Sequence, residues 1–147
     1  PGLQLPEGRY ESTTLASGAR IIYDAYNANL SGMRAALDAF AQEAGVRRIA
    51  VLASMAELGD EALRMHESVG EHAAKSGVDI VLAGGSYAHA LVAGAVRAGL
   101  SSERIVSFAT NDEAADWLRE NAGQGDVVLL KGSRVYKLEE VVERLRS

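Results

Sequence analysis

The sequence predicts an α/β fold, a Rossmann-like three-layer sandwich built on a mostly parallel sheet of about six strands. Short apolar runs alternate with longer segments of helical periodicity along nearly the whole chain, as expected when helices cover both faces of a parallel sheet. The run at 49–53 is apolar throughout, which is typical of a strand that is buried on both faces. The chain of 147 residues has the size of a single domain with one core.

The first two predicted strands form a hairpin. Segments 10–15 and 19–24 are strand-like and flank the turn sequence Ala16-Ser17-Gly18. Since the two strands of a hairpin run in opposite directions, this pair adds one antiparallel strand to the sheet.

The later elements alternate regularly. Strands are expected at 49–53, 80–83, 105–108 and 127–130, and helices at 31–40, 60–75, 86–98, 112–121 and near the C-terminus. Ser31 is expected to cap the first of these helices. The spacing in the second helix predicts an inward face made of Leu63, His66, Val69, Gly70 and Ala73.

The composition excludes several classes of function. The formal net charge is -5 and no basic block offsets it, so a general surface for nucleic acid or anionic membrane is not expected. The chain has no cysteine, which excludes a disulfide framework, a thiolate nucleophile and a cysteine-based zinc site. No run approaches the ~20 apolar residues of a membrane span, and the first residues lack the apolar core of a signal peptide. We therefore expect a cytoplasmic protein without a membrane span.

The beginning of the chain has the character of a linker. It starts with Pro1-Gly2-Leu3-Gln4-Leu5-Pro6 and has no initiator Met. We expect 1–8 to be an interdomain linker, 9–147 to be the folded domain, and the whole chain to be a piece of a larger protein.

The first polar cluster that suggests chemistry is Asp24-Ala25-Tyr26-Asn27-Ala28-Asn29, which follows the hairpin. Ligands of open α/β sheets bind beyond the carboxyl ends of the strands, where this cluster is expected. A carboxylate can accept hydrogen bonds from ribose hydroxyls, and side-chain amides offer both donors and acceptors. Asn27 and Asn29 can equally well shape a turn, and the sequence alone leaves both interpretations open.

The second cluster is Lys131-Gly132-Ser133-Arg134, directly after a predicted buried strand. Glycine allows a ligand to approach the backbone, serine adds a hydroxyl, and the two cations suit a carboxylate or a phosphate. A solvated basic turn is the alternative.

The third cluster is Met55-Ala56-Glu57-Leu58-Gly59, with His66 downstream on the inward face of a helix. A lone inward histidine is more often a packing residue than a catalytic one, and both roles stay open for His66. The three histidines are scattered and have no matching acidic or serine partners, so no metal site is predicted.

Three common motifs are missing from the sequence. It contains no G-x-x-x-x-G-K-[ST] loop for a triphosphate, no G-x-G-x-x-G loop for a dinucleotide and no G-x-S-x-G nucleophile elbow. If the domain takes part in ATP chemistry, the phosphates are held elsewhere.

Taken in this order, the clusters resemble the C-terminal domain of Mur ligases of the MurF type, the UDP-N-acetylmuramoyl-tripeptide:D-alanyl-D-alanine ligases. The helix sequence Ser31-Gly32-Met33-Arg34-Ala35-Ala36-Leu37 strengthens the resemblance, which spans nearly the whole chain. The residues that carry it are Gly8-Arg9, Asp24-Ala25-Tyr26-Asn27-Ala28-Asn29, Met55-Ala56-Glu57-Leu58-Gly59 with His66, and Lys131-Gly132-Ser133-Arg134.

The resemblance implies the closing domain of a three-domain ATP-dependent acid–amino-acid ligase (EC 6.3.2 type) of peptidoglycan precursor synthesis, inactive on its own. The full enzyme would join D-alanyl-D-alanine to UDP-MurNAc-tripeptide through an acyl phosphate, with ATP and Mg held mainly by the absent central domain. No catalytic residue is assigned in this chain. The residues implied at the nucleotide are Arg9, Asp24, Tyr26, Asn27 and Asn29, and those implied at the incoming substrate are Glu57, Lys131, Ser133, Arg134 and His66.

The chain departs from the family pattern at two places. Ala53-Ser54 stands where relatives have Gly-Asp, which leaves the identity of the incoming amine open, and Leu30 stands where many relatives have proline. Two alternatives therefore remain: a domain of another Mur-superfamily amide ligase, such as a folylpolyglutamate or cyanophycin synthetase relative, or a non-enzymatic, receiver-like binding module.

Overall fold

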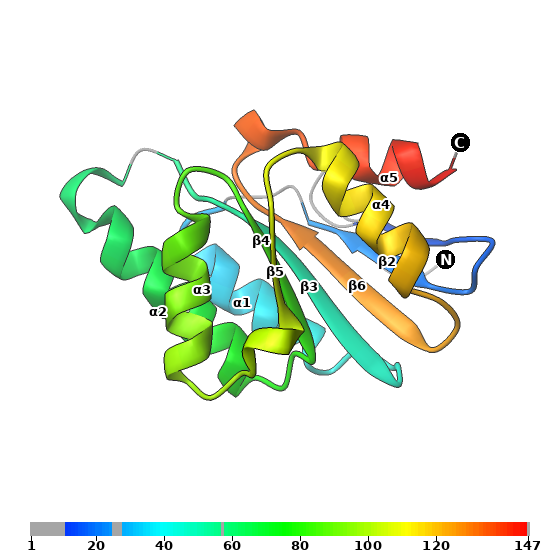
Figure 1. Cartoon of the computed structure of the whole chain (residues 1–147), viewed down its shortest axis with the longest axis horizontal. Helices are drawn as coiled ribbons and strands as arrows, with labels where there is room; N and C mark the ends of the chain where they lie inside the picture. The colour runs from blue at the N-terminus through cyan, green and yellow to red at the C-terminus, as the bar shows by residue number, and fades with distance from the viewer. Residues whose placement is uncertain (1–10, 25–27, 57, 147) are drawn as a thin grey trace.

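A six-stranded sheet in the order β1-β2-β6-β3-β4-β5 forms the centre of the computed structural model, which describes residues 11–24, 28–56 and 58–146 (Figure 1). Strand β1 pairs antiparallel with β2, and every other neighbouring pair is parallel. The predicted fold class and the N-terminal hairpin are therefore confirmed. The strands are β1 (Glu11–Thr14), β2 (Arg20–Tyr23), β3 (Arg47–Ala53), β4 (Ile80–Gly84), β5 (Ile105–Phe108) and β6 (Asp126–Lys131).

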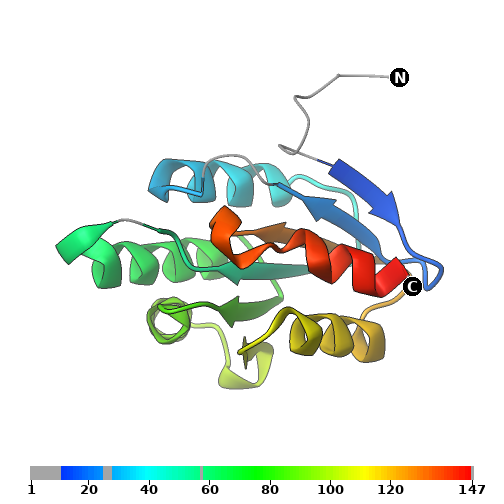
Figure 2. The same cartoon turned by 90° about the horizontal axis from the view of Figure 1, so that it is seen from above.

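Helices cover both faces of the sheet. Helices α1 (Leu30–Phe40), α2 (Ala62–Lys75) and α3 (Ala88–Arg97) pack on one face, to the left in Figure 1. Helices α4 (Asn111–Asn121) and α5 (Glu139–Arg146) pack on the other face. The β1–β2 hairpin lies at one edge of the sheet, with α1 and α5 on opposite sides of it (Figure 2). Short 3₁₀ turns at Gly59–Glu61, Ser102–Arg104 and Arg134–Tyr136 complete the chain.

Strand β3 illustrates why the core has two halves. Its side chains alternate between the faces, so that Val51 packs toward α4 and α5 while Leu52 packs toward α1, α2 and α3. Both are fully buried, and each contributes roughly 1.5–3 kcal/mol through the burial of apolar surface. This two-sided burial explains the continuous apolar run in the sequence.

Helices α2 and α3 cross in direct backbone contact. A Cβ atom on Gly70 would overlap the carbonyl group of Leu91, and one on Gly94 would overlap the carbonyl group of Glu67. Only glycine fits at these two positions.

Two helix starts differ from the prediction. The N-cap of α1 is Asn29 rather than Ser31, because the Asn29 Oδ1 atom accepts hydrogen bonds from both Gly32 N (2.7 Å) and Ser31 Oγ (3.3 Å). Helix α2 begins at Ala62, after a 3₁₀ turn. Of the predicted inward residues, His66, Val69, Gly70 and Ala73 are buried as expected. Leu63 is 51% exposed and Ala62 is buried in its place, so the expected inward position of Leu63 was wrong.

Candidate functional site

The five parallel strands β2, β6, β3, β4 and β5 all point the same way, so their carboxyl ends lie side by side. This end of the sheet, different from the lateral edge formed by the hairpin, is called the C-terminal edge. The loops that follow these strands contain all three clusters identified in the sequence. Four of the predicted site residues lie outside the described residues: Arg9, Tyr26, Asn27 and Glu57. The others are described: Asp24, Asn29, His66, Lys131, Ser133 and Arg134.

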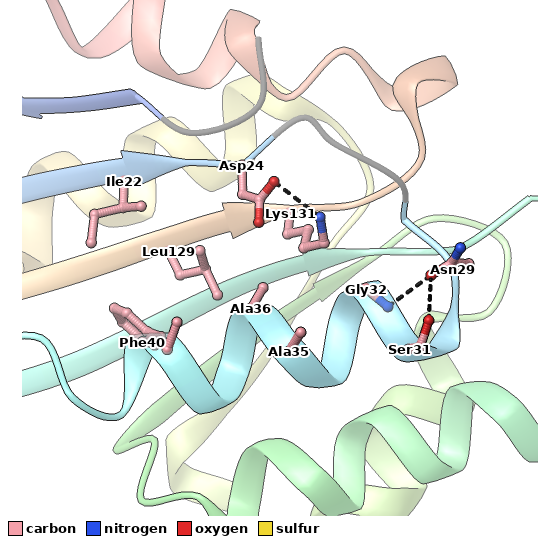
Figure 3. Close-up of a pocket in the computed structure, with 11 residues that line it drawn as sticks. Ile22, Asp24, Asn29, Ser31, Gly32, Ala35, Ala36, Phe40, Leu129 and Lys131 are labelled. Carbon is pink, nitrogen blue, oxygen red and sulfur yellow. Dashed lines mark hydrogen bonds and ion pairs between the residues drawn. The ribbon is translucent and has the colours of Figure 1, made fainter. Parts of the chain in front are cut away.

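Asp24 and Lys131 form an ion pair at this edge. The adjacent strands β2 and β6 bring them together, since Tyr23 pairs with Leu130 and Asp24 N donates to the Leu130 carbonyl at 3.0 Å. The Lys131 Nζ atom lies 3.1 Å from Asp24 Oδ1, and the two side chains are 2% and 16% exposed (Figure 3). Burial lowers the pKa of Lys131, and the Asp24 carboxylate opposes this by favouring the ammonium form. The pair therefore joins the first and second clusters at one point.

A groove runs from this ion pair along α1, with a volume of about 470 Å³ (Figure 3). The ion pair lies at its polar end, while Ile22, Leu129 and Phe40 form an apolar surface further along. Small side chains on α1, including Ala35 and Ala36, form the opposite wall and keep the groove open. A groove of this size, with few polar groups and a largely apolar surface, suits a small organic ligand.

Asn29 stands at the mouth of the groove, where it caps α1. Its side-chain oxygen is engaged with Gly32 and Ser31, which supports the structural role that the sequence left open. Leu30 is the first residue of the helix, a position at which proline is favoured because its missing N–H group costs nothing there. The departure from the family pattern at Leu30 thus concerns only the start of the helix.

Ser133 and Arg134 lie in the loop after β6. Ser133 N donates to the Ser54 carbonyl at 3.0 Å, and the Ser133 side chain caps the 3₁₀ turn Arg134–Tyr136. The Arg134 side chain is exposed, whereas Lys131 is buried against Asp24. The four residues predicted as one basic cluster are therefore divided: Lys131 faces the groove, and Arg134 faces solvent.

His66 lies inside the domain and is fully buried. Its Nε2 atom accepts from Met55 N at 2.8 Å, its Nδ1 atom lies 2.6 Å from the Ala62 carbonyl, and its ring stacks on Tyr87 with a centroid distance of 4.7 Å. Burial lowers the pKa of His66, so the neutral ring that donates from Nδ1 to Ala62 is favoured. His66 thus holds the backbone at Met55, directly before the third cluster, and both of its nitrogens face backbone atoms rather than the groove.

Tyr136 carries no functional signal in the sequence, although this residue contacts two of the loops that follow the strands. Its hydroxyl oxygen accepts from Ser86 N at 3.1 Å. Burial raises the pKa of Tyr136, but hydrogen bonds with Ser86 and Ser54 lower it by more, and the net pKa is below the ordinary value. A tyrosine beside a glycine-containing loop matches no catalytic motif, so only the folded arrangement reveals these contacts.

Among residues 11–24, 28–56 and 58–146, no group of three or more His, Asp or Glu side chains is placed to bind a metal ion. None of the helices in these segments is both long and apolar enough to cross a membrane.

The fold defines an α/β domain of the Rossmann-like class. The chain belongs to the Mur ligase family, since the family model for the "Mur ligase, glutamate ligase domain" matches residues 8–134. It is 32% identical over 145 residues to the UDP-N-acetylmuramoyl-tripeptide–D-alanyl-D-alanine ligase of Bacillus subtilis, a match that covers 98% of this chain and 32% of that protein.

Two solved structures agree with this assignment. A crystal structure of MurF from Acinetobacter baumannii matches with a TM-score of 0.83 at 30% identity, covering 98% of this chain and 31% of that one. The MurF ligase of Thermotoga maritima, crystallised in complex with ADP, matches with a TM-score of 0.78 at 26% identity over 98% of this chain and 31% of that one. The chain spans about a third of the length of these relatives.

Proposed function

We propose that this chain is the C-terminal domain of an ATP-dependent ligase that joins D-alanyl-D-alanine to UDP-MurNAc-tripeptide. The observation that carries the proposal is the match over 98% of the chain to a ligase of that name. Residues 1–8 would be the linker from the central domain and 9–147 the closing domain. The reaction belongs to peptidoglycan precursor synthesis in the cytoplasm, and thus to cell wall biogenesis, cell shape and cell division.

The polar end of the groove is proposed to meet the nucleoside part of ATP. The Asp24 carboxylate can accept hydrogen bonds from ribose hydroxyls, and its ion pair with Lys131 holds it at the rim of the groove. Asn29 stands at the same mouth, and Arg9, Tyr26 and Asn27 are proposed to join it on the sequence pattern alone. The ADP complex of the Thermotoga relative supports nucleotide binding by the family.

The phosphates and Mg are proposed to be held by the central domain. The chain has no Walker loop. Its described part contains no cluster of three or more His, Asp or Glu side chains that could hold a metal ion. The lack of clustered acids around Asp24 among those residues also disfavours a receiver-like module, which needs such acids to bind magnesium.

The incoming dipeptide is proposed to meet the loops after β3 and β6. The exposed guanidinium of Arg134 suits its carboxylate, because arginine can bind a carboxylate through two parallel hydrogen bonds. Ser133 lies next to Arg134, and Glu57 is proposed at the amine end on the sequence pattern. Lys131 and His66 would act indirectly, Lys131 through Asp24 and His66 through the backbone at Met55.

Closure of the domain would assemble these parts. The amine of the dipeptide attacks the acyl phosphate carbon, the C–O bond to phosphate breaks, and inorganic phosphate leaves. Holding both reactants together raises their effective concentration, and a closed interface keeps water away from the acyl phosphate. A chain that supplies only one side of this interface is expected to be inactive alone.

The proposal is tested by steady-state kinetics of the full-length protein that contains this chain. Asp24→Asn should raise the KM for ATP about tenfold, and Arg134→Gln should raise the KM for D-alanyl-D-alanine about tenfold, since each loses a charge-assisted hydrogen bond. Asp38→Asn and Arg97→Gln are matched controls on α1 and α3, and both residues make surface ion pairs away from the site. Turnover with glutamate instead of D-alanyl-D-alanine would replace the proposal with another amide ligase of the superfamily.

A further inference from the structure

Ser54 connects the loops after β3 and β4. Its side chain is fully buried directly after β3. The Ser54 Oγ atom donates to the Gly84 carbonyl at 3.0 Å and accepts from Tyr87 N at 2.8 Å. The hydroxyl thus uses both its donor and an acceptor position on the turn between β4 and α3.

Tyr136 reaches the same turn from the loop after β6. Its hydroxyl oxygen accepts from Ser86 N at 3.1 Å and lies 3.3 Å from Ser86 Oγ. Gly85 lies between the two side chains with a φ of +89°, and a Cβ atom there would lie 2.5 Å from Ser54 Oγ and 2.8 Å from Tyr136 Cζ. Ser54 and Tyr136 therefore converge on a backbone position that only glycine fits.

Two further contacts fix the loop after β6. Ser133 N donates to the Ser54 carbonyl at 3.0 Å, which joins this loop to β3. On the other side, Asn111 Nδ2 donates to the carbonyl oxygens of Tyr136 (2.8 Å) and Lys137 (3.1 Å). The segment 133–137 is therefore anchored to the ends of β3 and β4 and to the start of α4.

The part of the segment that remains exposed is its tip. Arg134 is exposed. Val135 is 70% exposed and is one of the few large apolar side chains in the described chain that are exposed to solvent. A tip with a cation and an apolar side chain, on a base fixed by hydrogen bonds from three directions, is pre-organised for contact with a ligand.

We propose that Ser54 and Tyr136 form a latch of neutral hydrogen bonds that sets the position of Arg134, which makes both of them positioning residues for the incoming dipeptide. The positioning role for the dipeptide rests on the proposed function, whereas the hydrogen bonds of the latch do not. Because both members are neutral, the buried contact avoids the desolvation cost of an ion pair. A fixed loop also reduces the conformational entropy that Arg134 loses when it binds a carboxylate.

The latch is tested first on the 147-residue chain by hydrogen exchange of the amides of Val135 and Tyr136. Tyr136→Phe removes the hydroxyl and keeps the ring, and exchange at these amides should become about tenfold faster, the effect of losing one hydrogen bond. Ser76→Ala is the matched control, because its hydroxyl donates to His72 and Ala73 carbonyls at the end of α2. Ser54→Ala is the second latch variant, because it removes the other hydroxyl group and leaves the tyrosine in place. Unchanged exchange in both latch variants would overturn the latch.

The positioning role is then tested in the full-length protein. Tyr136→Phe should raise the KM for D-alanyl-D-alanine about tenfold while kcat and the KM for ATP change less than about twofold, since only the binding of one substrate loses pre-organisation. Faster exchange with an unchanged KM for the dipeptide would overturn the positioning role. If the wild-type full-length protein forms no peptide bond with the dipeptide, the proposed function fails and the positioning role fails with it, while the exchange result still decides the latch.

Discussion

The Lys131 ammonium group lies 3.1 Å from the Asp24 carboxylate, although the two residues come from strands at opposite ends of the chain. They meet because β6 inserts between β2 and β3 in the sheet. The pair joins the start and the end of the domain at the polar end of the groove, so it bears directly on the stability of the domain.

Removal of one member of this pair should destabilise the domain. Asp24→Asn leaves the Lys131 ammonium, which is 2% exposed, without its carboxylate, and the free energy of unfolding should fall by about 2 kcal/mol. Lys131→Met should have a similar effect. The measurement is urea unfolding of each single variant and of the double variant.

The double variant should lose less than the sum of the two single losses, because neither charge is then left buried alone. Strict additivity of the two losses would show that the ion pair is not coupled energetically, contrary to the geometry.

The stability of the domain should depend on pH through His66. Its pKa in the folded chain is lowered from the ordinary value of 6.5, mainly by burial, so below that pH the unfolded chain binds more protons than the folded one. The free energy of unfolding should be fully retained above this pH and should fall on acidification by up to about 1.4 kcal/mol per pH unit. Protonation would also break the bond from Met55 N to Nε2.

The matched variants for this prediction are His66→Gln and His89→Gln, compared by thermal unfolding between about pH 7.5 and about pH 5, a window around the ordinary histidine pKa. His66→Gln should flatten the dependence on pH. His89→Gln, at an exposed position of α3, should preserve most of it, because burial is the main cause of the lowered His66 pKa and the charge of His89 is a smaller one. If the stability of both variants depended equally on pH, the dependence would come from groups other than His66.

Gly132 should not tolerate a side chain. A Cβ atom on Gly132 would overlap the Ala53 side chain, so Gly132→Ala should lower the free energy of unfolding by about 1–3 kcal/mol. Gly123→Ala is the control, since a Cβ atom there would meet only the Ser17 carbonyl at 3.9 Å.

The same overlap predicts a compensating change. Ala53→Gly should restore part of the stability lost in Gly132→Ala, because it removes the methyl group that blocks the new side chain. Equal losses with and without Ala53→Gly would mean that the Ala53 backbone, whose Cα atom would lie 2.9 Å from the added Cβ atom, blocks the side chain instead of the methyl group.

The sequence predicted the layers and the hairpin because both depend on local patterns. The alternation of apolar runs with amphipathic segments defines strands and helices one at a time, and the buried strand β3 follows from its own composition. The start of α1 was harder to predict, because Asn29 and Ser31 are both good caps. Only the folded turn shows which side chain accepts hydrogen bonds from the free N–H groups.

The site could be predicted only as separate clusters. Each cluster follows a strand, but the order of the strands in the sheet decides which clusters lie next to each other. The position of β6 beside β2 has no signal in the local sequence. The resemblance placed Asp24 at the nucleotide and Lys131 with Arg134 at the incoming substrate, whereas the fold joins Lys131 to Asp24 in an ion pair. The hydrogen bond between Ser86 N and the Tyr136 hydroxyl was also hidden, since Ser86 belongs to a different loop.

The central claim is tested most directly by mass spectrometry of the reaction products of the full-length protein with ATP, magnesium, UDP-MurNAc-tripeptide and D-alanyl-D-alanine. We predict conversion of the tripeptide to the pentapeptide with one phosphate released per peptide bond, and neither ATP hydrolysis nor ligation by the 147-residue chain alone. A full-length protein that leaves the tripeptide unchanged, or an isolated chain that forms the pentapeptide, would contradict the account.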